Sequence, residues 1–289
     1  MDRPPIPDGE LGVMNIVGIC RFSLLGRGDW KAYQNKPAEE VEQIALEQAV
    51  HLFAPARMEA RLQSFEQLTL ASMRAQTDQN FTFVVLASEL MPQPYRARLE
   101  AICAGVPQVV LRFFPITSVA AAQRLVFAEL GLRLGQTLQF RLDDDDCLCV
   151  DFIELMRRNT AGMMKSDLAF AASMRGVMYC KLAGATAGTY NWPVAFFSAG
   201  AALRHPTRSV FDFGHFGMAQ RFTSITIPGR MALVTNNGMN DTDFTPMMIK
   251  RRNMVLMEPE AVAETAARNF PFLDTQARAL AGLPDAVAD

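Results

Sequence analysis

The sequence predicts an α/β fold: a mostly parallel sheet with helices on both faces, followed by an α+β half. Three observations carry this prediction. Short apolar runs alternate with helical segments up to about residue 165, which is typical of βαβ units. From Asp167 the pattern changes to short strand candidates separated by Gly, Pro and Asn. Half of the 289 residues are apolar and 20% are charged, so a packed core is expected within one large domain.

In the first half, apolar runs predict four buried strands, at Val13–Cys20, Phe81–Leu86, Val109–Phe114 and Thr137–Leu142. Helical spacing of apolar residues predicts the intervening helices, at Ala38–His51, Arg57–Ala75, Tyr95–Cys103 and Val119–Leu134, and a further helix after Val150. Start signals support two of them, since Pro92 and Pro94 precede one helix and Ser118 can cap another. The regular alternation favours parallel strand pairing.

In the second half the expected strands are shorter, at Asp167–Ala172, Gly176–Leu182, Ala195–Ser198, Ser224–Ile227 and Ala232–Val234. From Pro259 the chain is rich in Ala and predicted to be helical, with breaks at Pro271 and Pro284. We therefore expect a tail (1–12), a first half (13–150), a second half of the same domain (151–258) and a C-terminal helical extension (259–289).

Composition excludes several classes of function. The net charge of -2 gives no electrostatic basis for a nucleic-acid partner. The three histidines (His51, His205 and His215) are too few for a zinc site built on several of them. The N-terminal residues lack an apolar segment behind a basic start, and no uncharged apolar stretch of about 18 residues occurs. We expect a soluble, cytoplasmic protein without a transmembrane segment.

The cysteines are odd in number and have no paired CxxC spacing (Cys20, Cys103, Cys147, Cys149 and Cys180). Most of them lie in apolar runs, which favours buried free thiols in a reducing compartment. Cys147 and Cys149 follow an acidic cluster and suggest a soft-metal site, but a single CxC favours core packing.

Four consecutive aspartates, Asp143–Asp146, follow the strand expected at Thr137–Leu142. Two unit charges ~4 Å apart near a protein surface repel by about 4 kcal/mol, so a cluster of carboxylates needs a compensating charge. A hard divalent cation supplies it, and ligands of α/β proteins bind beyond the carboxyl ends of the strands. The alternative is a solvated acidic turn that caps the next helix. The apolar segments on both sides favour a metal site.

The segment Leu142–Asp146 resembles the LDxDD form of the DxD motif in nucleotide-sugar-dependent glycosyltransferases of the GT-A fold. Ala120–Arg124 is similar to the Arg-bearing helix start of that family, with Arg124 19 residues before Asp143. A more particular similarity, over roughly Ile16–Asp243, is to the group named putative rhamnosyltransferases. It rests on Arg61–Phe83, Pro92–Arg96 and Phe140–Asp146.

The resemblance implies a GT-A-like fold with a nucleotide-sugar-binding first half and an acceptor-binding, catalytic second half. It implies transfer of a sugar, rhamnose by the group's name, from a dTDP-, UDP- or GDP-sugar to a saccharide or other hydroxyl acceptor. The expected outcome is inversion, with Mn²⁺ or Mg²⁺ as cofactor because these ions suit carboxylate and phosphate oxygens. The sequence leaves the sugar, the base, the acceptor, the stereochemistry and the oligomeric state open.

By the same resemblance, Asp145 is the principal metal ligand, Asp143 faces the ribose or the metal, and Asp146 orients this shell. Asp144 is expected to point to the opposite face, because strand residues alternate. His215 is a candidate late metal ligand, with an aromatic cluster as the alternative. Related sequences carry a His near the position of Asn237, so water would complete the metal shell here.

For the donor, Arg21 is expected to meet phosphate or base and Phe22 to stack on the base, or else to lie in the core. Arg124 is expected to reach the pyrophosphate, with a surface ion pair as the alternative. Arg61 and Ser88 are lesser candidates. Two further arginines are expected on solvated helix faces, Arg57 and Arg74.

The expected catalytic base is Asp241, which lies 98 residues after Asp143, with Asp243 and Asp212 as alternatives. A Gly/Asn-rich loop with two acids is equally compatible with a simple turn. On the acceptor side, Trp192 is expected to form a platform for the apolar face of a sugar, together with Tyr190, Phe196 and Phe197. Lys250–Arg252 is either a lid over the diphosphate or a solvated face.

Two other functions fit clustered acids. One is a nucleotidyltransferase or phosphohydrolase, although the chain has neither a GxGxRxxP-like start nor a GxxxxGK[ST] loop. The other is a non-catalytic domain that binds nucleotide or calcium and has lost its acceptor base.

Overall fold

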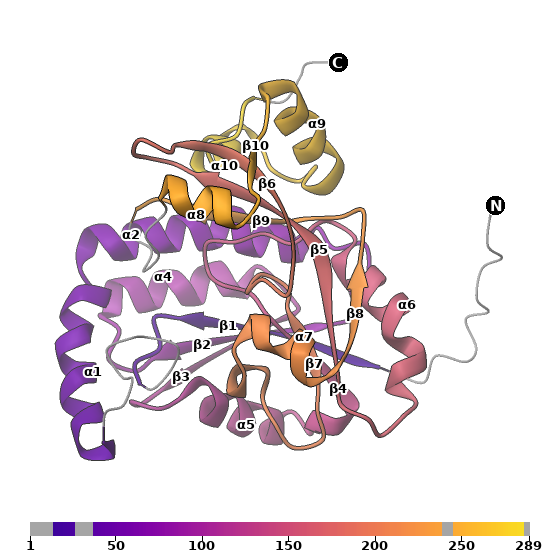
Figure 1. The fold of residues 1–289 in the computed structure, drawn as a ribbon. Coiled ribbons are helices and arrows are strands. Elements are labelled where there is room, and N and C mark those ends of the chain that lie inside the picture. Colours follow the sequence, from indigo (N-terminus) through magenta and orange to yellow (C-terminus); the bar gives the residue numbers. More distant parts are fainter. Residues whose placement is uncertain (1–13, 27–36, 239–244, 286–289) are drawn as a thin grey trace.

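A computed structural model describes residues 14–26, 37–238 and 245–285 of the chain. Its strands form a ten-stranded sheet in the order β10-β6-β5-β7-β4-β1-β2-β3, with β8 and β9 paired to β5 beside this path. Helices cover both faces of the parallel strands (Figure 1). The predicted α/β class, with a mostly parallel core followed by an α+β half, is confirmed.

The first half contains the parallel strands and most of the long helices. Its strands are β1 (Asn15–Phe22), β2 (Thr82–Ser88), β3 (Val109–Phe114) and β4 (Thr137–Arg141). Its helices are α1 (Ala38–Leu52), α2 (Pro55–Ser64), the π-helical η2 (Phe65–Leu70), α3 (Ala71–Arg74), α4 (Gln93–Ala104), α5 (Val119–Glu129) and the 3₁₀ turn η3 (Leu134–Gln136).

The second half begins with α6 (Phe152–Met164) and is otherwise built from strands and short helices. Its strands are β5 (Phe170–Lys181), β6 (Gly188–Ala195), β7 (Ala202–Arg204), β8 (Thr223–Ile227), β9 (Ala232–Asn236) and β10 (Val255–Leu256). Its other helices are η4 (Val210–Asp212), η5 (His215–Gly217), α7 (Met218–Arg221) and α8 (Pro246–Arg251), and the C-terminal pair is α9 (Pro259–Asn269) and α10 (Thr275–Leu280).

The parallel strands bring the candidate site residues to one edge of the sheet. In the pairing of β1 with β4, Ile19 lies opposite Arg141, so Arg21 and Asp143 follow at neighbouring strand ends. β1 can pass close to its neighbours because Gly18 has no side chain. A Cβ atom there would lie 2.3 Å from the Phe140 ring and 2.6 Å from the Phe83 ring. Both faces of this sheet are filled by buried apolar residues.

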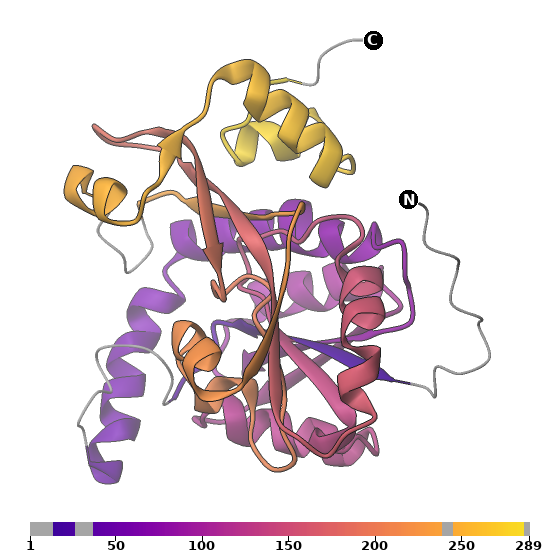
Figure 2. The same ribbon diagram turned by 45° about the vertical axis from the view of Figure 1, so that its right-hand side comes forward.

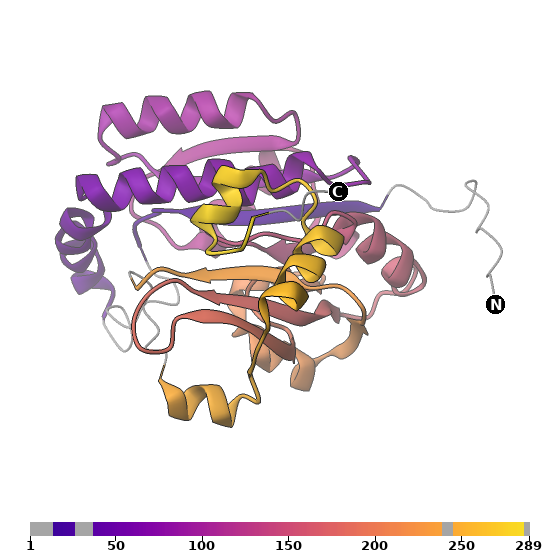
Figure 3. The same cartoon turned by 90° about the horizontal axis from the view of Figure 1, so that it is seen from above.

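The second half joins the same sheet through β7, which pairs with β4 in the antiparallel sense. Its central strand is β5, which pairs with β6 and β7 in the antiparallel sense and with β8 and β9 in the parallel sense. Seen from above, the parallel strands with α2 and α4 lie on one side, and β5, β6 and α8 lie on the other (Figure 3). β9 is tied to the segment after the aspartates by a bridge between Cys147 and Leu233. The seam between the halves therefore passes beside the acidic cluster.

Several element boundaries differ from the prediction. The two strands expected at Asp167–Ala172 and Gly176–Leu182 are the single strand β5, with an irregularity between Arg175 and Val177 that absorbs Gly176. The strand expected at Ala195–Ser198 is wrong, because β6 ends at Ala195 and Phe196 has a φ of +57°. The short strand β7 was not predicted.

Two helix predictions are also corrected. The helix expected at Arg57–Ala75 is interrupted by the π-helical turn η2. The helix expected to reach Leu134 ends at Glu129, because Gly131 follows with a φ of +66°, a conformation that ends helices.

The C-terminal extension is helical, as predicted, with α9 before Pro271 and α10 before Pro284. The two helices lie next to each other above the sheet (Figure 2), and α10 contacts η2. The five cysteines are buried free thiols, also as predicted. Within the described ranges, no helix is both long and apolar enough to cross a membrane. The proposed boundaries at residues 150 and 258 stay predictions.

Candidate active site

A pocket of about 430 Å³ opens at the carboxyl ends of β1 and β4, a size typical of small-molecule sites. Its lining is strongly charged, with four aspartates and five arginines, and one side is aromatic. The charged residues are Arg21, Arg57, Arg61, Arg141, Asp143, Asp144, Asp145, Asp146 and Arg252. The other functional side chains of the lining are Ser64, Tyr179, Phe197, His215, Phe216, Thr235, Asn236 and Asn237.

All four aspartates reach the pocket because they form a turn rather than the end of a strand. β4 ends at Arg141, and the next residues turn, with the Asp146 amide donating a hydrogen bond to the Asp143 carbonyl at 3.4 Å. The prediction that Asp144 faces away is therefore wrong, since strand alternation does not extend into the turn. Asp144 forms an ion pair with Arg61, whose Nε lies 2.7 Å from Oδ2. Burial raises the pKa of Asp144, and the Arg61 guanidinium opposes this rise.

Asp146 is a buried acid of the turn whose charged form is strongly disfavoured. Only 2% of the residue is exposed, and its Oδ1 accepts a hydrogen bond from the Thr235 amide at 3.4 Å. Burial raises the pKa of Asp146 well above its usual range, and the charges of Asp145 and Asp143 raise it further. Burial and the crowding of carboxylates in the turn therefore disfavour the charged form of Asp146.

The oxygen ligands at the pocket fit magnesium or manganese, and they leave part of the metal's coordination shell to the substrate. Within the described segments, no group of three or more His, Cys, Asp and Glu side chains is arranged to hold a metal alone. Mg²⁺ does not need such a cage, since proteins commonly bind it through one or two carboxylates together with substrate phosphates. Asp143 and Asp145 are half-buried at the pocket and supply this kind of hard oxygen ligand.

His215 also lines the pocket, and its ring is fixed. Its Nδ1 lies 2.7 Å from the Phe196 carbonyl oxygen, and its ring centroid lies 4.1 Å from that of Phe216. A carbonyl only accepts hydrogen bonds, so we assign the proton to Nδ1. Nε2 then carries the lone pair, which is the form that a metal ligand or an acceptor of a proton requires.

The arginines of the lining come from more elements than predicted. Arg21 and Arg61 lie in the pocket, as expected for donor candidates. Arg57 was expected on a solvated helix face, but it is half-buried on α2 and lines the pocket. Arg141 was missed, although its place at the end of the same strand, two residues before Asp143, is a signal for it. Arg252 lies with its guanidinium carbon 4.9 Å from the Trp192 ring centroid.

Two donor candidates lie in the core instead. Phe22 is fully buried and packs against Phe65 with ring centroids 5.0 Å apart, so stacking on a base is excluded in this conformation. Ser88 is also buried, and its hydroxyl accepts a hydrogen bond from the Leu90 amide. Neither side chain lines the pocket.

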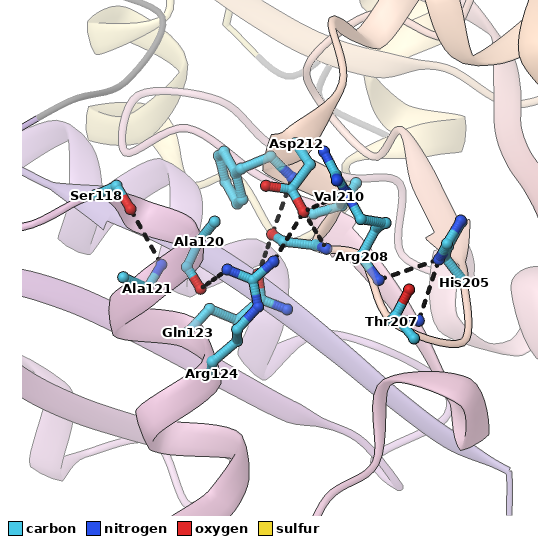
Figure 4. Close-up of polar contacts among 12 residues, drawn as sticks. Ser118, Ala120, Ala121, Gln123, Arg124, His205, Thr207, Arg208, Val210 and Asp212 are labelled. Atoms are coloured by element: carbon cyan, nitrogen blue, oxygen red, sulfur yellow. Dashed lines mark hydrogen bonds and ion pairs between the residues drawn. The ribbon is translucent and has the colours of Figure 1, made fainter.

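Arg124 and Asp212 bind each other away from the pocket lining. Arg124 Nη2 lies 3.0 Å from Asp212 Oδ2, and Arg208 contacts the same carboxylate (Figure 4). Asp212 also accepts a hydrogen bond from the Ser209 amide in a capping box. The expected roles of Arg124 at the pyrophosphate and of Asp212 as a base are therefore not supported by their positions.

The aromatic side of the pocket differs from the predicted platform. Trp192 is buried and lies edge-on behind Tyr179 and Phe197, which line the pocket together with Phe216. Trp192 thus supports this wall. Tyr190 is buried, and its hydroxyl donates to the Thr186 carbonyl. Lys250 and Arg251 are exposed, whereas Asp241 and Asp243 lie outside the described residues.

Comparison with known proteins gives one family. A family model described as "Putative rhamnosyl transferase" matches residues 15–249. No curated protein sequence matches the chain. The structure is similar to Staphylococcus aureus TarS, residues 1–349, in complex with UDP-GlcNAc, with a TM-score of 0.43, 10% identity and coverage of 92% of this chain and 76% of that one. For the complex with UDP these values are 0.40, 9%, 92% and 75%. Both TM-scores are below 0.5, so the functional argument rests on the family match.

Proposed function

Because the chain belongs to the family described as putative rhamnosyl transferase, and is thus a glycosyltransferase, we propose that it moves a sugar from a nucleoside-diphosphate donor to an acceptor hydroxyl with the aid of Mn²⁺ or Mg²⁺. Rhamnose is the proposed sugar, from the family's name. The donor base proposed is thymine, uracil or guanine, and the acceptor is a saccharide or another hydroxyl compound.

The observation that carries the proposal is the joining of carboxylates and arginines in one pocket at the carboxyl ends of parallel strands. A diphosphate leaving group needs both kinds of charge, because it gains negative charge as the bond to the sugar breaks. Mn²⁺ or Mg²⁺ held by the carboxylates would supply positive charge that stabilises the departing diphosphate. Asp145 and Asp143 are its proposed ligands, Asp146 the group that orients them, and His215 a further ligand through Nε2.

The arginines divide into two roles. Arg21, at the end of β1, and Arg57, on α2, are proposed to hold the diphosphate, since guanidinium groups match phosphate oxygens in charge and geometry. Arg61 already binds Asp144, so it is proposed to position the aspartate turn rather than the donor.

The acceptor side is proposed to lie along Tyr179, Phe197 and Phe216, whose rings offer an apolar surface to a sugar. Asp241 remains the proposed base, and the transfer is proposed to invert the configuration. β9 ends at Asn236, and Asn237, which lines the pocket, stands four positions before Asp241 in the sequence.

A transfer assay tests this proposal. The purified chain is incubated with dTDP-, UDP- and GDP-sugars and Mn²⁺, and released nucleoside diphosphate is measured with and without a panel of saccharide acceptors. We expect release with at least one donor, loss of release with EDTA, and at least a ~100-fold loss in Asp145→Asn, equivalent to about 2.7 kcal/mol.

The control is Asp167→Asn, which changes an exposed aspartate far from the pocket lining and should keep full activity. Full activity of Asp145→Asn would reject the metal-dependent mechanism. Metal-dependent nucleotide binding without release from any donor would favour the non-catalytic alternative.

A further inference from the structure

Three successive backbone carbonyls of the aspartate turn each lie within hydrogen-bonding distance of a buried side-chain hydroxyl. Thr69 Oγ1 donates to the Asp143 carbonyl at 3.3 Å, and Ser64 Oγ lies 3.3 Å from the Asp144 carbonyl. Thr235 Oγ1 donates to the Asp145 carbonyl at 2.9 Å. We refer to Ser64, Thr69 and Thr235 as the hydroxyl clamp.

Two members of the hydroxyl clamp come from one helix, and its π turn explains how. Residues five apart lie about 140° from each other around an α-helix, so Ser64 and Thr69 would face different directions. In a π-helix the turn is wider, with hydrogen bonds from i to i+5, so residues five apart lie on the same face. The π segment Phe65–Leu70 begins directly after Ser64. It therefore allows both hydroxyls to face the aspartate turn.

The third member comes from the opposite side of the pocket, on β9. Thr235 binds the turn twice, through its hydroxyl to the Asp145 carbonyl and through its amide to Asp146 Oδ1. The bridge between Cys147 and Leu233 fixes the backbone next to it. The two halves of the chain thus hold the turn from both sides.

The turn needs such support because its carboxylates repel one another inside a partly buried site. Ser64, whose hydroxyl is also 3.1 Å from the Arg61 carbonyl, shares its single proton, so Thr69 and Thr235 are the sharper tests. We infer that Thr69 and Thr235, assisted by Ser64, are positioning residues that hold Asp143 and Asp145 together for the divalent cation of the proposed function, on which this inference rests.

The test removes each hydroxyl without changing side-chain shape, through Thr69→Val, Thr235→Val and the double variant. Mn²⁺ affinity is measured in the presence of UDP or dTDP by the electron paramagnetic resonance signal of free Mn²⁺. We expect each single variant to bind Mn²⁺ roughly fivefold more weakly, as for the loss of one hydrogen bond, and the double variant more weakly still. Thr235→Ser should restore the affinity.

The matched control is Thr160→Val. Thr160 is also fully buried, and its hydroxyl also donates to a backbone carbonyl, that of Met156 at 2.8 Å, but it lies on α6. This variant should lose a similar amount of stability toward urea while Mn²⁺ affinity stays unchanged. Unchanged affinity in both clamp variants, or an equal loss in Thr160→Val, would overturn the inference.

A second measurement separates this inference from the proposed function. If the unaltered chain binds no Mn²⁺ with either nucleotide, the proposed function fails. The positioning role of the hydroxyl clamp is then tested by amide hydrogen exchange of residues 143–147 in the metal-free protein. Faster exchange there in Thr235→Val than in Thr160→Val supports the positioning role. Equal exchange in the two variants refutes it.

Discussion

At the scale of single residues, Asp146 shows a conflict between stability and the proposed chemistry. Its carboxylate is buried, and both burial and the neighbouring charges raise its pKa. A raised pKa in the folded state means that folding disfavours the charged form that the unfolded chain carries at neutral pH. A carboxylate kept in such a place weakens the fold and is expected where function requires it.

Asp146→Asn should therefore stabilise the metal-free protein. The amide keeps an oxygen for the Thr235 amide, and it removes the cost of the buried charge. A gain of ~1 kcal/mol would raise Tm by about 2–4 °C. The gain should grow as the pH rises above 3.8, the usual pKa of an aspartate, because the original carboxyl loses stability with rising pH.

The measurement is thermal unfolding in EDTA at pH 5 and pH 8, with Asp167→Asn as an exposed control. A lower Tm for Asp146→Asn at pH 8, or a gain that is larger at pH 5, would show that the buried carboxylate stabilises the fold.

The residue-scale expectations from sequence agree with the pocket lining where they rested on charge and strand ends, and differ from it where they rested on orientation. The acidic cluster, Arg21 and His215 all line one pocket, and their roles there stay predictions. The orientation of Asp144 depends on where β4 stops, and the burial of Phe22 depends on Phe65 from a distant helix. Both the orientation of Asp144 and the burial of Phe22 depend on tertiary packing, which the local sequence does not encode.

At the scale of elements, α2 supplies two of the arginines that line the pocket, Arg57 and Arg61, whereas α5 supplies none. Arg57 on α2 lines the pocket, whereas Arg124 on α5 binds Asp212 outside the lining. The sequence resemblance favoured Arg124, since it precedes the aspartates at a family-like spacing. The position of α2 over the pocket follows from packing between helices and sheet, which spacing does not encode.

We expect Arg57→Gln to weaken binding of the nucleotide-sugar donor about tenfold, as for the loss of a charged hydrogen bond. Arg124→Gln should leave donor binding unchanged and cost at most ~1 kcal/mol of stability, since 45% of the Arg124 side chain is exposed. Calorimetric titration of both variants with the nucleotide-sugar donor, in the presence of Mn²⁺, shows which of the two arginines binds the donor. The reverse pattern would restore Arg124 as the pyrophosphate ligand.

Element boundaries were predicted best where local signals are strong. β3 has the predicted bounds, and α9 and α10 end near the predicted prolines. The π turn η2 was not predictable, because its extra residue is stabilised by contacts with the aspartate turn, which is distant in sequence. Gly176 suggested a break in β5, but pairing on both sides carries the strand through it.

At the scale of the whole molecule, the candidate site lies on the seam between the parallel half and the mixed half. β4 pairs with β1 on one side and with the antiparallel β7 on the other, and the aspartates follow β4. α2 and β9 approach the same turn from the two halves. The class of fold and the location of the acidic site were predictable from the alternation of elements, whereas the pairing of β5 with four strands was not.

The central claim is that the aspartate turn binds a divalent ion that also contacts the diphosphate. A crystal grown with Mn²⁺ and UDP or dTDP tests it most directly, because manganese can be located by anomalous scattering. We predict a peak ~2.0–2.3 Å from oxygens of Asp145 and the diphosphate, with Asp143 in the same shell. A nucleotide bound in the pocket with no manganese at these carboxylates would contradict the claim.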